Sequence, residues 1–435
     1  SGKQGRLLMA SQLAAHGGAR VVPEGSIKPW PWIRDEDRAA VADVLAGDGI
    51  AGSREAQATG LASEFAEYVG AKHCVPCNSG TAALHMCVAG LEIGPGDEVI
   101  TTAHTYWASA AAVLHHQAIP VFVDIDPRTY CMDPAQLESR ITSHTRAIMP
   151  VHIHGMPCDM DAILDIAERH GLAIIEDVAQ AHGSKHRGRM CGTMGACAGF
   201  STQMSKNLTT GSEGGLFTTD DDVILRRAET LQYLGEIVVP GRERAEQEYN
   251  ARGMGWMYRG DVFGQAFARS QLTRLEDLND ARIANCHRLT DGLKGVSGVA
   301  APYEPGNVRH TYYNYVLTVR PDELGLDITP AAMRGKLEKA LRAEGMDVGL
   351  WQRMPVPSQT VFQSRVGFGK GYPWANPEAR DVQYHAEDYP RATEFIDAAL
   401  YVFGIGAPND IATMDLYIEA MAKVLGDVDG LMAVE

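Results

Sequence analysis

The sequence is poor in positive charge. Among its 435 residues, 39 are Lys or Arg and 55 are Asp or Glu, which gives a formal net charge of −16. A chain this acidic repels a phosphate backbone, so nucleic acid is not expected as a partner. No apolar run approaches the ~20 residues that span a bilayer, and the N-terminus lacks the apolar core of a secretory signal. We therefore expect a cytoplasmic protein that does not enter a membrane.

Cysteine is also too sparse for a disulfide scaffold, with eight in the whole chain. Cys74 and Cys77 have the C-x-x-C spacing of metal and redox sites. No second pair of this kind follows, and both cysteines lie in an apolar stretch. Buried free thiols in a reducing compartment are the favoured interpretation, and no metal site is predicted.

The chain does have enough hydrophobic residues, 45%, for a large core in two lobes. From about residue 60, helix-like and strand-like segments alternate. The strand-like segments are residues 97–102, 119–126, 145–153 and 172–178, and the helix-like ones are 64–73, 80–94, 106–118, 133–141 and 159–171. Such alternation predicts right-handed βαβ units and a mostly parallel sheet flanked by helices.

The alternation weakens after about residue 222. A long helical stretch follows at 262–295, and residues 310–319 ("HTYYNYVLTV") have antiparallel strand character. We therefore predict a loose N-terminal arm over 1–25, a large α/β domain over 26–280 and a smaller α+β domain over 281–435.

Four stretches place reactive or anion-binding groups where a strand leads into a helix or loop, the position at which open parallel sheets form sites. They are "CNSGTAAL" (77–84), "HTYWASA" (104–110), "IIEDVAQAHG" (174–183) and "FSTQMSKNLTTGSEGG" (200–215). They offer hydroxyls and amides at a helix start, an aromatic ring (Tyr106 or Trp107), the strand-end Asp177 and Lys206. Singly, each is more often a helix cap, a packing residue or a solvated lysine. Together and in this order they match pyridoxal phosphate (PLP).

The sequence resembles the DegT/DnrJ/EryC1/StrS aminotransferases, which are fold-type-I PLP enzymes. Further motifs that carry the resemblance are "EYVGAKHCVPCNSGTAALH", "PVFVDIDPRTYCMDP", "IMPVHIHGMPCDMDAI" and "IIEDVAQAHGSKHRGRMCGTMG". The resemblance runs from about residue 30 to the C-terminus. It implies a homodimer with shared active sites, Glu or Gln as amino donor, and a cyclic ketone as acceptor.

The resemblance also implies roles for individual residues. Lys206 would be the Schiff-base lysine and Asp177 the partner of the pyridine nitrogen, so these two are the predicted catalytic residues. The other implied cofactor contacts are Gly80, Thr81 and Ser201 at the phosphate, Tyr106 on the ring face and Gln180 near the ring hydroxyl. His182, Gln203 and Arg259 are predicted to face the substrate.

Four positions depart from the family pattern. Gln203 stands where many sugar-nucleotide members have His, Ser212 is an extra residue in the glycine cluster after Lys206, and Met257 replaces an Asn that contacts the partner's phosphate. Pro357 ends a stretch that is of the Pro-Val-His type in the family. These changes lie around the substrate and predict an unusual acceptor.

The predicted function is transfer of an amino group from Glu or Gln to a keto-cyclitol or similar cyclic ketone in natural-product or aminocyclitol biosynthesis, including antibiotics. A nucleotide-linked keto-sugar aminotransferase is the second possibility. A PLP-binding regulator without turnover is an alternative from another class. A Rossmann-type dehydrogenase lacks support, because no G-x-G-x-x-G follows the first strand.

Overall fold

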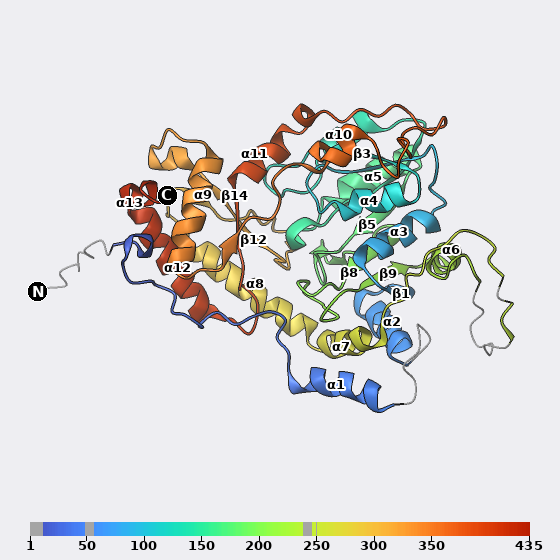
Figure 1. Ribbon diagram of the computed structural model, residues 1–435, viewed down its shortest axis with the longest axis horizontal. Coiled ribbons are helices and arrows are strands. Elements are labelled where there is room, and N and C mark those ends of the chain that lie inside the picture. Colours follow the sequence, from blue (N-terminus) through green and yellow to red (C-terminus); the bar gives the residue numbers. More distant parts are fainter. Residues whose placement is uncertain (1–11, 48–55, 238–245, 249) are drawn as a thin grey trace, which may run out of the picture.

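The computed structural model describes residues 12–47, 56–237, 246–248 and 250–435. Figure 1 shows two bodies joined by the helix α8 (Leu275–Gly292). The helices that precede α8 are α1 (Asp35–Ala46), α2 (Ala56–Val69), α3 (Gly80–Gly90), α4 (Ala108–His115), α5 (Met160–His170), α6 (Asp222–Gln232) and α7 (Val262–Leu272). Those that follow it are α9 (Pro330–Ala343), α10 (Thr360–Ser364), α11 (Pro390–Ala398), α12 (Ile411–Gly426) and α13 (Val428–Met432).

The larger body is built on a seven-stranded sheet in the order β1-β9-β8-β5-β4-β2-β3. Its strands are β1 (His73–Cys77), β2 (Glu98–Thr102), β3 (Ile119–Val123), β4 (Thr145–Ile148), β5 (Ala173–Asp177), β8 (Cys197–Ser201) and β9 (Gly215–Thr219). β9 runs antiparallel to β1 and β8, and the other neighbours run parallel. The predicted mostly parallel sheet is confirmed.

Both faces of this sheet are covered because its strands are apolar at successive positions. Ile174 and Ile175 are neighbours on β5 and point to opposite faces. Ile175 packs in a core with residues of α3, α4 and α6, whereas Ile174 packs in a core with residues of α2 and α5. Burial on both sides is why these strands read as continuous hydrophobic runs.

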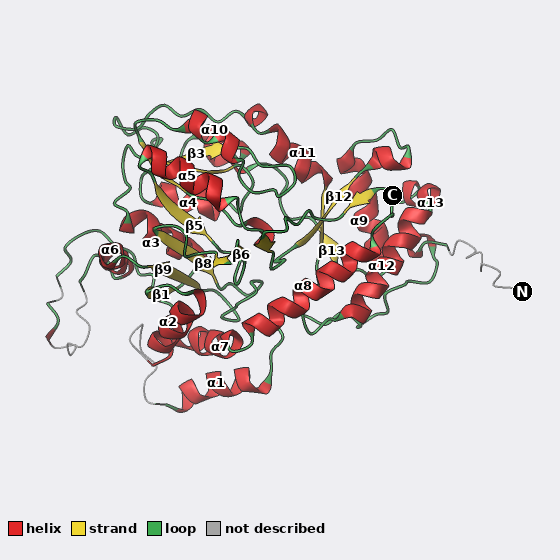
Figure 2. Ribbon diagram, turned by 180° about the vertical axis from the view of Figure 1, so that it is seen from behind, coloured by secondary structure: helices red, strands yellow, loops and turns green. Residues whose placement is uncertain are grey.

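The second body has a four-stranded sheet in the order β10-β12-β14-β13, with antiparallel pairs throughout. Its strands are β10 (Val299–Ala300), β12 (Tyr315–Val319), β13 (Val348–Gly349) and β14 (Ala399–Val402). Figure 2 shows α9, α12 and α13 gathered around it, and Leu317, Leu337 and Met421 share its core. A small separate sheet joins β6 (Lys185–His186), β7 (Arg189–Met190) and β11 (Val308–Arg309).

The predicted division at residue 280 falls inside α8. Leu275 packs in a core of the larger body, whereas Cys286 packs in the core of the second body. The chain also returns to the larger body after β13, because Phe362 and Tyr384 pack edge-on against Phe122 of β3. Residues 356–389, predicted to belong to the C-terminal domain, thus pack against the first body, whereas α11 also contacts α9 and β12 of the second body.

Of the predicted loose arm, residues 1–11 lie outside the described residues. Residues 12–25 pack against the second body: Leu13 and Val22 are buried in its core, and the Val22 N–H donates to the Glu344 carbonyl at 2.9 Å. This part of the arm is therefore ordered by hydrophobic burial.

The helix predicted over 133–141 is wrong. The structure has two 3₁₀ turns there, Pro134–Gln136 and Glu138–Arg140. Leu137 is the fully buried side chain of this segment, which gives too little packing to hold an α-helix of so few residues. In the described part of the chain, none of the helices has the length and apolarity needed to cross a membrane.

Candidate active site

A cavity of about 370 Å³ lies where β1, β5 and β8 end. These three strands run in the same direction, so their carboxyl ends meet at one edge of the sheet. Eight of the predicted site residues line this cavity: Gly80, Thr81, Tyr106, Asp177, Gln180, Ser201, Gln203 and Lys206. Folding therefore gathers residues that are up to 126 positions apart in the chain, from 80 to 206.

Lys206 lies in the loop between β8 and β9. Its backbone N–H donates to the Gln203 carbonyl at 2.8 Å, and its Nζ lies 4.2 Å from the centre of the Tyr313 ring. The loop is held closed by hydrogen bonds from Thr202 N–H to Gly214 O (2.9 Å) and from Met204 N–H to Ser212 O (2.7 Å). The extra Ser212 is thus part of the closure that presents Lys206 to the cavity.

The glycines after Lys206 serve close packing of backbone. A Cβ on Gly215 would lie 2.2 Å from the Ser79 carbonyl oxygen, and one on Gly214 would lie 2.4 Å from Thr202 Oγ1. Side chains there would push the lysine loop away from the start of α3. Glycine is required because it alone has no Cβ.

Asp177 is the last residue of β5 and is 4% exposed. Its Oδ2 accepts a hydrogen bond from the Ser109 hydroxyl at 2.7 Å, and its Oδ1 accepts one from the Ala179 N–H at 3.0 Å. Burial raises the pKa of Asp177, while these two bonds and the nearby charge of Lys206 act in the opposite direction. The carboxylate is held in one orientation at the cavity wall.

The start of α3 forms an anion-binding cradle. The Ser79 hydroxyl caps the helix by accepting from Ala82 N–H at 3.1 Å, and the amides of Gly80 and Thr81, in the first turn, have no carbonyl partner within the helix. A Cβ on Gly80 would lie 2.6 Å from Ser201 Cβ, so the helix start and the end of β8 are in direct contact. Free amides beside a serine hydroxyl suit a phosphate group.

The structure distinguishes the two aromatic candidates at 106 and 107. Tyr106 is 57% exposed and lines the cavity, whereas Trp107 packs against a hydrophobic core of the larger body. Gln180 is buried at the cavity wall, and its Oε1 accepts from the His154 N–H at 2.8 Å. Gln203 lines the cavity and accepts at Oε1 from the Ser205 hydroxyl at 2.7 Å.

Two predicted substrate residues lie elsewhere. His182 is fully buried and its ring packs against Phe200, with 5.6 Å between the ring centres. Arg259 is exposed, with its Nε 3.1 Å from the Met257 sulfur and its guanidinium 5.9 Å from the Tyr233 ring. Neither lines the cavity of this chain.

Several lining residues escaped the sequence analysis. Ser109 lies within the stretch singled out around Tyr106, and its spacing from Asp177 gave no hint of their hydrogen bond. Tyr313 and Trp351 come from the second half of the chain; the first lies in a stretch predicted only as a strand, and no element was predicted around the second. Long-range placement of this kind leaves no local signal in the sequence.

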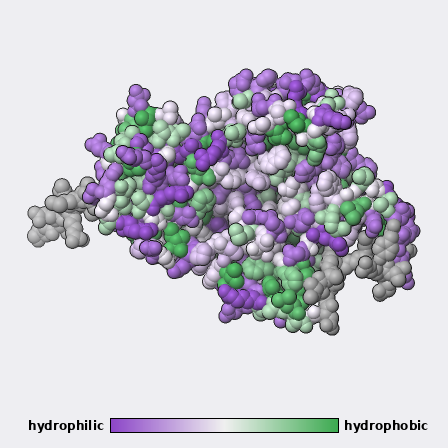
Figure 3. All heavy atoms as spheres, viewed as in Figure 1, coloured by the Kyte–Doolittle hydropathy of each residue, from purple (hydrophilic) through white to green (hydrophobic). Residues whose placement is uncertain are grey.

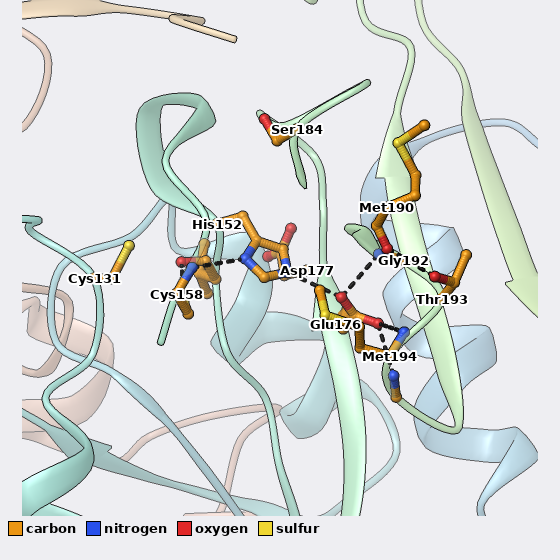
Figure 4. A network of polar contacts seen from close by, with 12 residues as sticks. Cys131, His152, Cys158, Glu176, Asp177, Ser184, Met190, Gly192, Thr193 and Met194 are labelled. Carbon is orange, nitrogen blue, oxygen red and sulfur yellow. Dashed lines mark hydrogen bonds and ion pairs between the residues drawn. The ribbon is translucent and has the colours of Figure 1, made fainter. Parts of the chain in front are cut away.

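Behind Asp177, its neighbour Glu176 organises a network of buried polar contacts (Figure 4). Glu176 accepts from the N–H groups of Gly192 (2.8 Å), Met194 (2.6 Å) and Gly195 (2.7 Å), and from His152 Nε2 at 3.1 Å. Burial raises the pKa of Glu176, but the bond from His152 and those from the amides outweigh it and leave the pKa below its usual range. This carboxylate ties the loop after β4 to the loop before β8.

The residues at the cavity fit PLP. The α3 cradle suits the phosphate, Asp177 suits a protonated ring nitrogen, and Lys206 shares the cavity with both. The sequence profile of the DegT/DnrJ/EryC1/StrS aminotransferase family matches residues 31–381. The chain belongs to this family. The predicted family, fold type and aminotransferase class are thereby confirmed.

Among the similar proteins, one is named for scyllo-inosose and another for GDP-perosamine. The chain is 41% identical over 347 residues to L-glutamine:scyllo-inosose aminotransferase of Streptomyces griseus, covering 77% of this chain and 80% of the relative. It is 41% identical over 284 residues to GDP-perosamine synthase of Caulobacter vibrioides, covering 65% of this chain and 72% of the relative. The protein Spr1654 of Streptococcus pneumoniae, solved in its PLP form, superposes with a TM-score of 0.78 at 25% identity, over 92% of this chain and 98% of that one.

Proposed function

We propose that this family member uses PLP to transfer an amino group from glutamine or glutamate to a keto-cyclitol. The observation that carries the proposal is the convergence of Lys206, Asp177 and the α3 cradle on one cavity. PLP, when bound, supplies an aldehyde that condenses with amines and a ring that withdraws electrons from the carbon that loses its proton.

The residues of this chain have separable tasks in that reaction. Lys206 provides the amine that holds the cofactor and moves the proton. Asp177 would keep a proton on the ring nitrogen, the α3 amides and Ser201 would bind the phosphate, and Tyr106 would cover the ring. Gln180 lies within the same wall and is assigned to the ring hydroxyl.

Charge favours a small neutral acceptor over a nucleotide-linked one. Among the described residues that line the cavity, Lys206 is the cation, and Asp177 and Glu213 are the anions. A diphosphate requires Arg or Lys partners when it leaves water. Arg187, from the basic loop after Asp177, is instead paired with Asp161 at 3.0 Å and does not line the cavity. The name of the Streptomyces griseus relative, with scyllo-inosose as acceptor, supports the same choice.

The test uses the purified protein with PLP, α-¹⁵N-labelled glutamine and scyllo-inosose. We expect mass spectrometry to find the label in an aminocyclitol. Labelled product with a GDP-linked keto-sugar alone would favour the nucleotide-linked alternative instead. Absence of any labelled amine, with cofactor bound, would favour a regulator without turnover.

A second measurement tests the lysine. Borohydride reduction followed by peptide mapping should place the cofactor on Lys206, and Lys206→Ala should lose turnover entirely. The matched control is Lys185→Ala, on strand β6 outside the cavity, which should keep its activity. Attachment at any other lysine would overturn the assignment.

We further propose a homodimer in which Arg259 serves the site of the partner subunit. Arg259 is exposed and points to no group of its own cavity. Apolar side chains nearby are exposed as well, Met254 to 92% and Trp256 to 46%. Figure 3 shows a further group of hydrophobic residues at the lower edge of the molecule, over α1, where Leu45 is exposed. Exposed apolar groups of this size are typical of interfaces.

A further inference from the structure

A second cavity, of about 510 Å³, shares Ser205 and Tyr313 with the first. Its walls come from residues 27–30 of the N-terminal segment, from α8, and from the end of β14 with the loop that follows it, 402–409. The residues assigned to the cofactor do not line this cavity. One side chain of its wall is a buried cation, as expected at a site that binds an anion.

That side chain is Arg282, in the middle of α8. It is 8% exposed, and its Nε is buried without a hydrogen-bond partner among the described residues. The guanidinium lies 5.4 Å from the Trp30 ring, and a Cβ on Gly406 would lie 2.7 Å from its Cζ. It is therefore wedged between an aromatic ring and a glycine backbone, with its planar face covered.

Arg282 also has no counter-charge. Burial lowers its pKa, and the groups that act on it electrostatically are Cys286 and Tyr313, with no carboxylate among them. A buried cation without a paired carboxylate is costly, because no opposite charge compensates for its lost hydration. Proteins retain such an unfavourable buried charge at sites where a bound ligand neutralises it.

The charges of the cavity wall define that ligand. Its charged residues are Lys28, Arg282 and Asp347, which give a net charge of +1, and Arg282 is the buried one of the two cations. We propose that this cavity binds an organic carboxylate through the guanidinium of Arg282. One carboxylate group at Arg282 neutralises the cavity, and the second carboxylate of a longer diacid is several bonds away and can stay in water. A phosphate instead brings both of its charges into the cavity together, where Asp347 would repel the uncompensated one. The planar guanidinium suits a carboxylate with two parallel hydrogen bonds.

Two sources of carboxylate are compatible with this position. One is the amino donor: Tyr313 lines both cavities and its ring centre is 4.2 Å from Lys206 Nζ, so an amino acid bound here would be adjacent to the reacting amine. The other is a separate acid that binds beside the donor. Arg282 would bind the carboxylate of either molecule in the same way, and inhibition kinetics distinguish the two.

The test is calorimetric titration of the full-length protein, loaded with PLP, with glutarate and with its neutral analogue glutaramide. We expect glutarate to bind and glutaramide to bind at least about tenfold more weakly, because only glutarate supplies charge-assisted bonds. Arg282→Gln should weaken glutarate binding about 10- to 100-fold. The matched control is Arg288→Gln on the same helix, since Arg288 pairs at the surface with Asp415 at 2.7 Å.

Stability separates a binding role from a structural one. If Arg282 is kept for a ligand, Arg282→Gln should leave the Tm of the ligand-free protein unchanged or raise it, since an unpaired charge leaves the interior. Asp347→Asn should tighten glutarate binding several-fold, because a like charge leaves the cavity. Equal glutarate binding by Arg282→Gln and the parent would overturn the proposal, as would weaker binding by Asp347→Asn.

Inhibition kinetics then identify the source. Competition between glutarate and glutamine, with a raised KM for glutamine in Arg282→Gln, would assign the site to the donor. Non-competitive behaviour with an unchanged KM would assign it to a separate acid. The titration itself requires no transamination, so a failure of the proposed function and a failure of this site give different results.

Discussion

Glu176 and Asp177 are adjacent carboxylates with opposite tasks. Successive residues of a strand point to opposite faces, so Asp177 reaches the cavity while Glu176 turns into the interior. The difference in surroundings follows: Asp177 accepts two hydrogen bonds at the cavity wall, and Glu176 accepts four from a histidine and three amides. Asp177 is therefore available to a cofactor, whereas Glu176 serves only to hold the surrounding loops in place.

Removal of the negative charge at Asp177 tests its task. Asp177→Asn should lower kcat about 10²-fold, or about 3 kcal/mol, because the ring nitrogen would no longer be held protonated. Ser109→Ala keeps the charge and removes one hydrogen bond, so its loss should be at most about tenfold. Steady-state kinetics on the two variants check this order. Equal activity of Asp177→Asn and the parent would reduce Asp177 to a structural residue.

Burial of His182 predicts how the free energy of unfolding depends on pH. Burial lowers the pKa of His182 to about 3, against about 6.5 in an unfolded chain. Because the unfolded state binds the proton more readily, stability is fully present above pH 6.5 and falls as the pH drops toward 3, by about 1.4 kcal/mol per pH unit for this one histidine. His182→Leu should flatten the decline between pH 6 and 4 in urea unfolding. Parallel pH profiles for variant and parent would contradict it.

At the scale of elements, the carboxyl end of β5 is positioned by the loop that follows β4. The His152 N–H donates to the Asp177 carbonyl at 3.0 Å, and the Asp177 N–H donates to the Pro150 carbonyl at 2.9 Å. Glu176 connects His152 to the loop that enters β8, so one buried carboxylate holds two of the loops around the site together.

Glu176→Gln should disrupt the contacts that hold these two loops together. The new amide places an N–H group against backbone N–H donors, and the free energy of unfolding should fall by about 3 kcal/mol. Denaturant titration measures the loss. Glu168→Gln, a surface substitution on α5, should change it by no more than about 0.5 kcal/mol. An equally small change for Glu176→Gln would mean that the amides find other partners.

At the scale of the whole molecule, the question is whether one chain completes the site. The cavity contains Lys206 but lacks Arg259, which lies exposed on the same chain. In a symmetric dimer the same surface is used twice, so each subunit can offer its Arg259 to the other.

Subunit mixing tests the shared site. Lys206→Ala and Arg259→Ala should each be nearly inactive alone. Refolded together, they should regain about one quarter of the parent activity, since half of the dimers would be hybrids with one intact site each. Light scattering checks that both variants remain dimers. No recovery on mixing would mean that Arg259 acts within its own chain or not at all.

The sequence by itself determined the parts of this protein that depend on local pattern and on motif. Alternating apolar segments predicted the parallel sheet, because strands buried on both faces are apolar at every position. Lys206, Asp177 and Gly80 could be predicted as site residues because each belongs to a family motif. The segment 133–141 was predicted wrongly, since Leu137 is its one fully buried side chain and gives too little packing for a short α-helix.

Only the tertiary structure decided which of these residues meet. It separated His182 from the cavity and brought Ser109 to Asp177, Tyr313 to Lys206 and Trp351 to the cavity wall. It also buried Arg282 beside Trp30, 252 positions earlier in the chain. Contacts across such distances depend on how whole elements pack, and packing is a property of the assembled core that no local stretch of sequence encodes.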